Sequence, residues 1–220
     1  ILSSDERWKA IKVIHEGEET QAEHLSGSQG EPDYLVVEGR RVRWISEKDL
    51  TKLPWKELGV DVVLECTGRF TKDGSARVHI QAGAKRVIVS APTQGGCVET
   101  FLRGVNDREY RGQEVISNAS CTTNCVSPVV AIVHAAFGIV KAAMTTIHAV
   151  TAEQNLVDSA PPGLHPDLRR GRSAMVNMVP TTTGAAITTT EAIPEIKGKF
   201  DGMAIRVPIS VGSLSDFTFL

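Results

Sequence analysis

The sequence predicts an α/β protein, with an incomplete doubly wound parallel sheet in its first half and an incomplete α+β arrangement in its second. Two observations predict this fold class. Strand, helix and strand patterns follow one another within about 30 residues (60–92), which is the pattern of a βαβ unit. After residue 120 the apolar segments become β-branched or alternating, which favours antiparallel strands with helices. We therefore place the boundary between the two parts near residue 120.

The first half contains three expected strands. The Val-rich run at 60–66 and the run at 85–92 are short and apolar, as is typical of strands buried in a parallel sheet. Between them we expect a helix with Thr71 as its N-cap and Gly83 at its end. A further strand at 114–120 leads to a pair of cysteines. The loops after the first two strands lie at the carboxyl edge of the sheet, where open α/β sheets bind ligands.

The elements of the second half are predicted from changes in residue type along the chain. Residues 129–140 are expected to form a buried helix, and the segment AAMTTIHAVTAEQ (142–154) a β-branched strand that carries His148. A Pro- and Arg-rich loop follows, then a Thr-rich segment that begins a helix, and last a strand with alternating character at 202–219. Residues 1–33 are polar and have few apolar anchors, and no GxGxxG fingerprint occurs in the chain, so this segment stays unplaced.

The composition is that of an ordinary globular protein. Hydrophobic residues make up 41% of the chain and charged residues 23%, and the net charge of −2 gives no electrostatic case for nucleic acid or a membrane surface. Four cysteines are too few for a disulfide scaffold, so we expect a reducing, cytoplasmic setting. The most apolar stretch, 129–144, is too short for a membrane span. Because the chain has no initiator Met and stops in a strand-like run, we expect it to be a fragment.

The segment SNASCTTNC (117–125) leaves three interpretations of Cys121: a nucleophile, half of a metal site with Cys125, or a buried thiol. A zinc site would need two more ligands, and Cys66 and Cys97 lie on separate elements. A buried structural thiol is the commonest state of a free cysteine, and we expect it for Cys125, one turn further on. A strand end followed by a helix favours the nucleophile for Cys121, because the N–H groups at a helix start stabilise a thiolate.

The start of that helix is open. A helix that begins at the cysteine would contain Pro128, which removes a main-chain hydrogen bond. Alternatively, Ser127 is the N-cap and Pro128 the first helical residue, which would leave Cys121 further from the helix dipole. A neighbouring base would then matter more for forming the thiolate of Cys121. His148 is the best candidate, because its strand leads directly into Thr151, although a structural histidine is the commoner case.

Hydroxyl groups and arginines indicate anion recognition. The run PTTTGAA (180–186) places three threonines and a glycine ahead of the expected helix, so hydroxyl and main-chain N–H groups are able to hold an anion. Arg206 lies between apolar residues of a strand and needs a partner, which an anionic substrate would supply. The arginines at 169, 170 and 172 are equally compatible with a solvated face.

Taken in order, SNASCTTNC, TTIHAVTAEQ, DLRRGR, TTTGAA and AIRVP resemble the phosphorylating glyceraldehyde-3-phosphate dehydrogenase family, and ECTGRF and RVIVSAP resemble its cofactor domain. The likeness covers about residues 34–220. It implies a Rossmann-type NAD(P)-binding domain at 1–120 and a catalytic domain at 121–220. It also implies the glycolytic oxidation of glyceraldehyde 3-phosphate to 1,3-bisphosphoglycerate through a cysteine hemithioacetal and thioester. The cofactor would be NAD, with NADP open, and the assembly a cytoplasmic homotetramer without metal, nucleic acid or membrane partners.

The resemblance also assigns residues. It implies that Cys121 is the nucleophile and His148 its base. It implies that the phosphate groups and the reacting carbonyl are held by Ser120, Thr122, Thr151, Arg170, Thr183, Gly184 and Arg206. It implies that the nicotinamide cofactor site is lined by Thr67, Gly68 and Ser90.

The chain departs from the family at both ends. The glycine-rich loop, the acidic residue that holds the adenosine ribose and the carboxyl-terminal segment are absent, so we expect little dehydrogenase activity from the 220 residues alone. Three alternatives stay open: an erythrose-4-phosphate dehydrogenase, a cysteine hydrolase, and an inactive fragment or binding module. Activity measured on both aldehydes distinguishes the erythrose-4-phosphate dehydrogenase. Hydride transfer to the cofactor excludes the cysteine hydrolase, and failure to bind the cofactor favours the inactive fragment or binding module.

Overall fold

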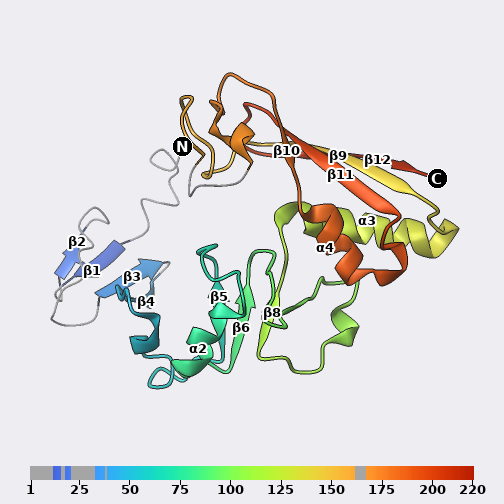
Figure 1. Cartoon of the computed structure of the whole chain (residues 1–220). Helices are drawn as coiled ribbons and strands as arrows, with labels where there is room; N and C mark the ends of the chain where they lie inside the picture. Colours follow the sequence, from blue (N-terminus) through green and yellow to red (C-terminus); the bar gives the residue numbers. More distant parts are fainter. Residues whose placement is uncertain (1–11, 16–17, 21–32, 38, 162–166) are drawn as a thin grey trace. The chain divides into compact units, whose positions relative to one another are not determined.

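The computed structural model of the chain describes residues 12–15, 18–20, 33–37, 39–161 and 167–220 (Figure 1). The chain divides into two compact units, residues 1–60 with 81–84 and residues 61–80 with 85–220. The expectation that residues 1–33 stay unplaced concerns a segment that lies largely outside the described residues.

The first unit contains an antiparallel sheet in the order β2-β1-β3-β4. Its strands are β1 Lys12–His15, β2 Glu18–Thr20, β3 Asp33–Val37 and β4 Arg40–Trp44. All of β4 is exposed, including the apolar side chains of Val42 and Trp44, which alternate with arginines, and the sequence analysis does not predict this sheet. A short 3-10 helix, η3 Leu50–Lys52, follows and is capped by the side chain of Asp49.

The second unit contains the predicted parallel sheet, in the order β5-β6-β8-β7 (Figure 1). Its strands are β5 Val62–Glu65, β6 Arg86–Val89, β7 Glu99–Thr100 and β8 Val115–Ser117. The 3-10 helix η4 Ser75–Arg77 and helix α2 Val78–Gln81 connect β5 to β6, which confirms the βαβ unit. The short 3-10 helix η5 Asp107–Glu109 lies between β7 and β8.

The helix of this βαβ unit starts later than we expect. Gly74 is the N-cap of η4, and Thr71 is not a cap. The carbonyl of Thr71 instead accepts a hydrogen bond from the main-chain N–H of Gln94, because the loops after β5 and β6 pair with each other. The expected N-cap at Thr71 is therefore wrong.

The second sheet of this unit has the order β10-β11-β9-β12. Its strands are β9 Ala142–His148, β10 Val179–Thr182, β11 Phe200–Arg206 and β12 Leu214–Phe219. The antiparallel expectation holds for the outer pairs, but β9 and β11 at the centre are parallel. The single strand expected at 202–219 is wrong, since an irregular loop with Gly212 at φ 83° divides it into β11 and β12.

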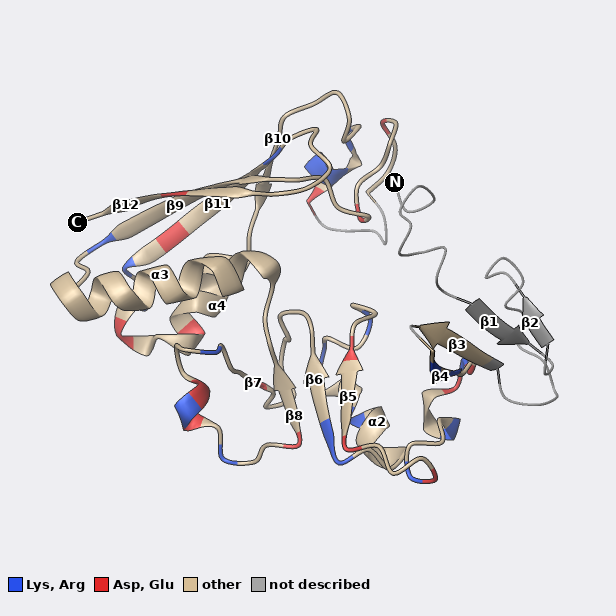
Figure 2. Ribbon diagram, turned by 180° about the vertical axis from the view of Figure 1, so that it is seen from behind, with Lys and Arg blue, Asp and Glu red and all other residues tan. Residues whose placement is uncertain are grey.

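Helices α3 Cys121–Phe137 and α4 Ala185–Ala192 cover one face of this sheet (Figures 1 and 2). Val126, Val130, Met144 and Ile196 form the centre of the shared core, and the 3-10 helix η8 Pro194–Ile196 supplies the last of them. The helix expected at 129–140 is buried on one side only, because Phe137 is 86% exposed. Among the described helices, none combines the length and the apolar character needed to cross a membrane.

Candidate active site

Cys121 is the first residue of α3, and the turn after β8 places it there. Ala119 in this turn has φ 57°, a left-handed conformation that is uncommon for a residue with a Cβ atom and is often found at functional sites. The N–H of Ala119 donates to Ser117 Oγ over 3.0 Å. Ser120 is the N-cap, and its Oγ accepts from the N–H of Thr123 over 3.1 Å. The cap fixes the helix start at the thiol.

The alternative start at Ser127 is therefore wrong, and Pro128 lies inside α3. Ser127 is fully buried and its Oγ lies 2.9 Å from Thr189 Oγ1 of α4, so it cannot serve as a cap. A hydroxyl pair thus joins the two helices below the site. Cys121 lies in the first turn, where the positive end of the helix dipole acts on it most strongly.

His148 lies at the end of β9, directly opposite the thiol. Its Nε2 atom is 3.6 Å from Cys121 Sγ. Its Nδ1 atom is 2.7 Å from the carbonyl oxygen of Ala149, which can only accept a hydrogen bond, so Nδ1 carries the proton of a neutral ring. The Nε2 lone pair then faces the sulfur. The structure brings the two predicted residues into the arrangement in which an imidazole takes a proton from a thiol.

The cysteines differ from expectation in one respect. All four, Cys66, Cys97, Cys121 and Cys125, are free and exposed. The expectation that Cys125 faces the core is wrong, because residues four apart share one side of a helix, and Cys121 and Cys125 share the exposed side of α3. The buried-thiol interpretation of Cys121 falls for the same reason.

The thiol and the imidazole line a cavity of about 680 Å³. Every residue expected to hold phosphate or carbonyl groups lines it as well, namely Ser120, Thr122, Thr151, Arg170, Thr183, Gly184 and Arg206. The expected cofactor residues Thr67, Gly68 and Ser90 do not line it; they follow β5 and β6 at the carboxyl edge of the parallel sheet.

Two loops link that edge to the cavity. Thr71 after β5, and Pro92 and Gln94 after β6, line the cavity together with Cys121 and His148. The N–H of Gln94 donates to the carbonyl of Thr71 over 2.8 Å, which ties the loops together. Gly96 allows this approach, since a Cβ atom there would lie 2.0 Å from the nitrogen of Gly74. The edge where open α/β sheets bind ligands thus borders the thiol.

The charge in the cavity is unbalanced. Arg170 and Arg206 both pair with the carboxylate of Glu153, which is the only acidic residue lining the cavity within the part of the chain that the structure describes. Arg206 also donates to Thr151 Oγ1 over 2.7 Å. Burial and the nearby Arg170 lower the pKa of Arg206, while Glu153 opposes this shift. Among the described residues, the buried Nε–H groups of both arginines have no acceptor. One positive charge is left over, which suits an anion.

Glu153 is a residue that the sequence analysis missed. It lies two positions after Thr151 in the quoted segment TTIHAVTAEQ, and an acidic residue there is a possible partner for the buried Arg206. The requirement that a buried arginine has a partner points to such a residue. We sought that partner only in a substrate, whereas the protein supplies part of it.

Comparison with known proteins settles the family. Residues 120–220 match the family model "Glyceraldehyde 3-phosphate dehydrogenase, C-terminal domain", and residues 8–73 match "Glyceraldehyde 3-phosphate dehydrogenase, NAD binding domain". The chain belongs to the glyceraldehyde-3-phosphate dehydrogenase family. The likeness begins at residue 8 and not near residue 34 as we expect from the motifs, so the amino-terminal segment is part of it.

Individual relatives agree with this assignment. The chain is 45% identical over 211 residues to glyceraldehyde-3-phosphate dehydrogenase of Chlamydia pneumoniae, which covers 95% of the chain and 62% of the relative. It is 50% identical over 190 residues to the enzyme of Mycobacterium leprae, with 86% and 55% covered. It is 46% identical over 184 residues to the chloroplastic dehydrogenase B of Pisum sativum, with 83% and 40% covered. The chain spans about half the length of the relatives it matches.

The arginine loop of this dehydrogenase-family chain has two kinds of side chain. In the 3-10 helix η7 Leu168–Gly171, the side chain of Arg170 is 11% exposed, whereas those of Arg169 and Arg172 are 51% and 59% exposed. Of the three arginines, only Arg170 has a largely buried side chain, so the interpretation as a solvated face is wrong for this residue. Asp167 caps η7, and hydrogen bonds from Arg169, together with those from main-chain N–H groups, hold the pKa of Asp167 well below its ordinary value although burial acts in the opposite direction.

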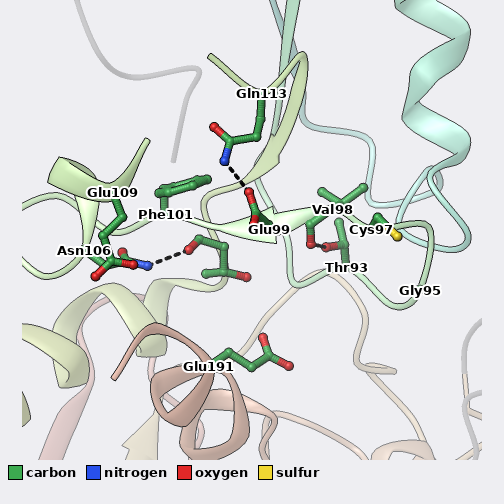
Figure 3. Close-up of a pocket in the computed structure, with 11 residues that line it drawn as sticks. Thr93, Gly95, Cys97, Val98, Glu99, Phe101, Asn106, Glu109, Gln113 and Glu191 are labelled. Carbon is green, nitrogen blue, oxygen red and sulfur yellow. Dashed lines mark hydrogen bonds between the residues drawn. The ribbon is translucent and has the colours of Figure 1, made fainter. Parts of the chain in front are cut away.

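A second cavity of about 440 Å³ differs in its chemistry (Figure 3). Cys97, Glu99, Glu109 and Glu191 line it, and no described lysine, arginine or histidine does. Its described lining offers no imidazole beside Cys97 and no cation to hold an anion, so it lacks the two features that distinguish the first cavity. The described part of the chain also holds no group of three or more His, Cys, Asp or Glu suited to a metal ion.

Proposed function

We propose that this chain carries the catalytic site of a phosphorylating glyceraldehyde-3-phosphate dehydrogenase of glycolysis, which converts glyceraldehyde 3-phosphate to 1,3-bisphosphoglycerate with NAD. Residues 1–120 belong to its NAD-binding domain and residues 121–220 to its catalytic domain. The observation that carries the proposal is the 3.6 Å contact between Cys121 Sγ and His148 Nε2 within a cavity that has one uncompensated positive charge.

The reaction begins at the sulfur. Cys121 Sγ adds to the aldehyde carbon and forms a hemithioacetal. The carbonyl oxygen gains negative charge as it does so, and the N–H groups of Cys121 and Thr122 lie in the first turn of α3, where a helix has no intrahelical acceptor for them. These two N–H groups are therefore suited to stabilise that oxygen before it becomes the hydroxyl of the hemithioacetal.

His148 takes part in the next two steps. Its Nε2 atom removes the hydroxyl proton while the C–H bond of the same carbon breaks with its electron pair, which oxidises the carbon to a thioester. Inorganic phosphate then attacks the thioester carbon. The C–S bond breaks, the product leaves as an acyl phosphate, and Cys121 returns as a thiolate that His148 in its protonated form stabilises.

The residues present fit the nicotinamide end of the cofactor. Gly68 has φ 70°, a Cβ atom there would meet nothing within 4 Å, and its neighbour Thr67 and the nearby Ser90 are exposed at the carboxyl edge of the parallel sheet. The loops of this edge border the thiol through Thr71 and Gln94. Bound NAD supplies the hydride acceptor for the oxidation. Thr67, Gly68 and Ser90 would hold it there.

Two anion sites are required, one for the substrate phosphate and one for the attacking phosphate. Arg206 and Thr151 form one, because they are hydrogen-bonded to each other and act as a unit. Ser120, Thr122, Thr183 and Gly184 contribute hydroxyl and main-chain groups near the starts of α3 and α4, which favour anions. Arg170 supplies charge to the cavity between them.

We assign this enzyme to the cytoplasm as a homotetramer. Free thiols at all four cysteines support a reducing compartment. The uncovered face of the sheet β10-β11-β9-β12 carries the exposed apolar side chains of Met203 and Leu214, and such a surface supports association with further copies. Size-exclusion chromatography with light scattering measures the number of copies.

The function is tested with purified protein that carries this chain. Continuous NADH formation should require glyceraldehyde 3-phosphate, NAD and inorganic phosphate together, whereas without phosphate NADH formation should stop after about one NADH per site, at the thioester. Hydroxylamine should trap the acyl phosphate. Cys121→Ser should abolish NADH formation, and His148→Asn should slow it by about 10²-fold or more. Erythrose 4-phosphate serves as the competing aldehyde, and a higher kcat/KM with it would change the substrate assignment. Ester hydrolysis at Cys121 without NAD reduction would contradict the proposal.

A cofactor-independent readout accompanies this assay. Glyceraldehyde 3-phosphate alone should protect Cys121 from iodoacetamide, because the hemithioacetal blocks the sulfur. Unphosphorylated glyceraldehyde should protect less at equal concentration. If neither aldehyde protects Cys121, the sulfur is not the nucleophile.

A further inference from the structure

A buried acidic residue and a buried histidine lie under the loop that follows β5, and the proposed chemistry uses neither. Glu65 is the last residue of β5 and is 3% exposed, and His79 of α2 is 4% exposed. Their Oε2 and Nε2 atoms are 2.9 Å apart. A carboxylate accepts and does not donate, so Nε2 of His79 carries the shared proton. Burying such a pair is costly unless each group is well hydrogen-bonded, which raises the question of what it holds in place.

Glu65 is hydrogen-bonded to two of the three residues expected at the cofactor. Its Oε1 atom accepts from the main-chain N–H of Thr67 over 2.8 Å and also from the Thr67 hydroxyl. Its main-chain carbonyl accepts from the N–H of Ser90 over 3.0 Å. The side chain thus holds the turn after β5, while the main chain of the same residue holds the start of the loop after β6.

The turn is tightened further from within. The N–H of Arg69 donates to Thr67 Oγ1 over 3.2 Å, so the hydroxyl that donates to Glu65 also accepts from the residue two positions ahead. Gly68 between them adopts φ 70°. The ring of Phe70 meets the His79 ring edge-on, with centroids 6.3 Å apart. His79 therefore supports both ends of the turn, one through Glu65 and the other through Phe70.

The electrostatics agree with a fixed carboxylate. Burial on its own would raise the pKa of Glu65, but the hydrogen bonds from Thr67 and His79 outweigh burial and hold the pKa below its ordinary value. Glu65 is thus ionised at neutral pH and acts as a strong double acceptor. Hydrogen bonds to a charged acceptor are about twice as strong as neutral ones, which gives the turn one preferred conformation.

We propose that the Glu65–His79 pair is a positioning device for the cofactor: it fixes the turn Thr67–Phe70 so that Thr67 and Gly68 meet the nicotinamide half of a bound dinucleotide. The proposal rests on the function proposed above. Glu65 and His79 are positioning residues, because they act through Thr67 and do not touch the reacting atoms. Their removal should weaken cofactor binding and leave the thiol chemistry of Cys121 unchanged.

The test uses two variants. Glu65→Leu removes the acceptor and places an apolar side chain in the buried position, and Glu65→Gln keeps an acceptor oxygen. Titration with NAD should show a dissociation constant raised about tenfold in Glu65→Leu, the size expected when a hydrogen bond to a charged group is lost. Glu65→Gln should restore binding to within about twofold. The rate at which iodoacetamide modifies Cys121 should be equal in all three proteins. His79→Leu replaces Glu65→Leu if the latter does not fold.

Hydrogen exchange at two amides separates positioning from general loosening. The N–H of Thr67 bonds to the Glu65 side chain and should exchange faster in Glu65→Leu, whereas the N–H of Ser90 bonds to the Glu65 main chain and should not. Equal acceleration at both amides, or an unchanged NAD dissociation constant, overturns the proposal. If the wild-type protein binds no NAD, the proposed function fails by itself. The two amides then decide whether the pair fixes the turn.

Discussion

Replacing Arg206 by alanine separates two roles of a buried cation, anchoring a phosphate and supporting the fold. The guanidinium group donates to Thr151 Oγ1, Glu153 Oε1 and Gln154 Oε1 over 2.7, 2.8 and 3.2 Å. After its removal Glu153 still pairs with Arg170, so no carboxylate is left without a partner. We expect the free energy of unfolding to fall by about 1–3 kcal/mol, less than the 3–5 kcal/mol typical when one member of a buried pair is left alone.

The effect on catalysis should be larger and should depend on the substrate. A phosphate held by charge-assisted hydrogen bonds gains about 1.5–3 kcal/mol from each, so the loss of Arg206 should cost about 3 kcal/mol in the transition state. This equals a fall of about 100-fold in kcat/KM for glyceraldehyde 3-phosphate. Unphosphorylated glyceraldehyde cannot use the contact, so its kcat/KM should change far less.

The assay measures kcat/KM for both aldehydes, together with thermal unfolding, in wild type, Arg206→Ala and Arg172→Ala. Arg172 is a matched control, since it pairs with Asp158 at the surface and both side chains are more than half exposed, at 59% and 53%. Its substitution should leave kcat/KM and stability almost unchanged. An equal loss on both aldehydes in Arg206→Ala would refute the phosphate role and show that the arginine is structural.

Three further outcomes are expected. Iodoacetamide should modify Cys121 faster than Cys125, as peptide mapping would show, and His148→Asn should slow this several-fold; preferential labelling of Cys125 would contradict the assignment. Ser127→Ala should lower the free energy of unfolding by about 1–3 kcal/mol because Thr189 loses a buried partner, whereas adding Thr189→Val should recover most of it; no recovery would mean that packing dominates. Hydrogen bonds from the neighbouring arginine lower the pKa of Asp167, so its stabilising effect should be present above its ordinary pKa near 4 and be lost as the pH falls through the lower native pKa. Chemical unfolding of Asp167→Asn should therefore show a deficit at neutral pH that disappears in strong acid, and a deficit that persists there would contradict this origin.

The parts of the fold that the sequence predicts are those whose burial leaves a local pattern. Strands β6 and β9 are short apolar or β-branched segments with side chains that enter a core, whereas Val62 and Leu64 of the equally apolar β5 are exposed. Each of the three strands was expected near its observed position. Strand β4 was missed although Val42 and Trp44 alternate with arginines, and in the structure all of this short strand is exposed. The parallel pairing of β9 with β11 leaves no local sequence pattern, because the two strands lie far apart in the chain.

The sequence predicts which residues form the candidate site but not how they lie relative to one another. The motif around Cys121 and the strand around His148 identify a thiol and an imidazole, but the contact between them joins positions 27 residues apart and depends on packing. The error on Cys125 has a simple source. The sequence left the helix start open, and only a helix that begins at Cys121 places Cys125 four residues further on and on the same exposed side.

The position of the sulfur is fixed from two directions, and this explains why one helix carries the chemistry. On one side, the turn after β8 ties the start of α3 to the parallel sheet, since Ser117 Oγ both accepts from Ala119 and donates to the carbonyl of Ala91. On the other side, the body of α3 packs under the sheet whose strand β9 presents His148. A shift of α3 relative to either sheet would lengthen the 3.6 Å contact between Cys121 and His148. The left-handed backbone at Ala119, unfavourable by about 1–3 kcal/mol, persists because it joins these two constraints within a few residues.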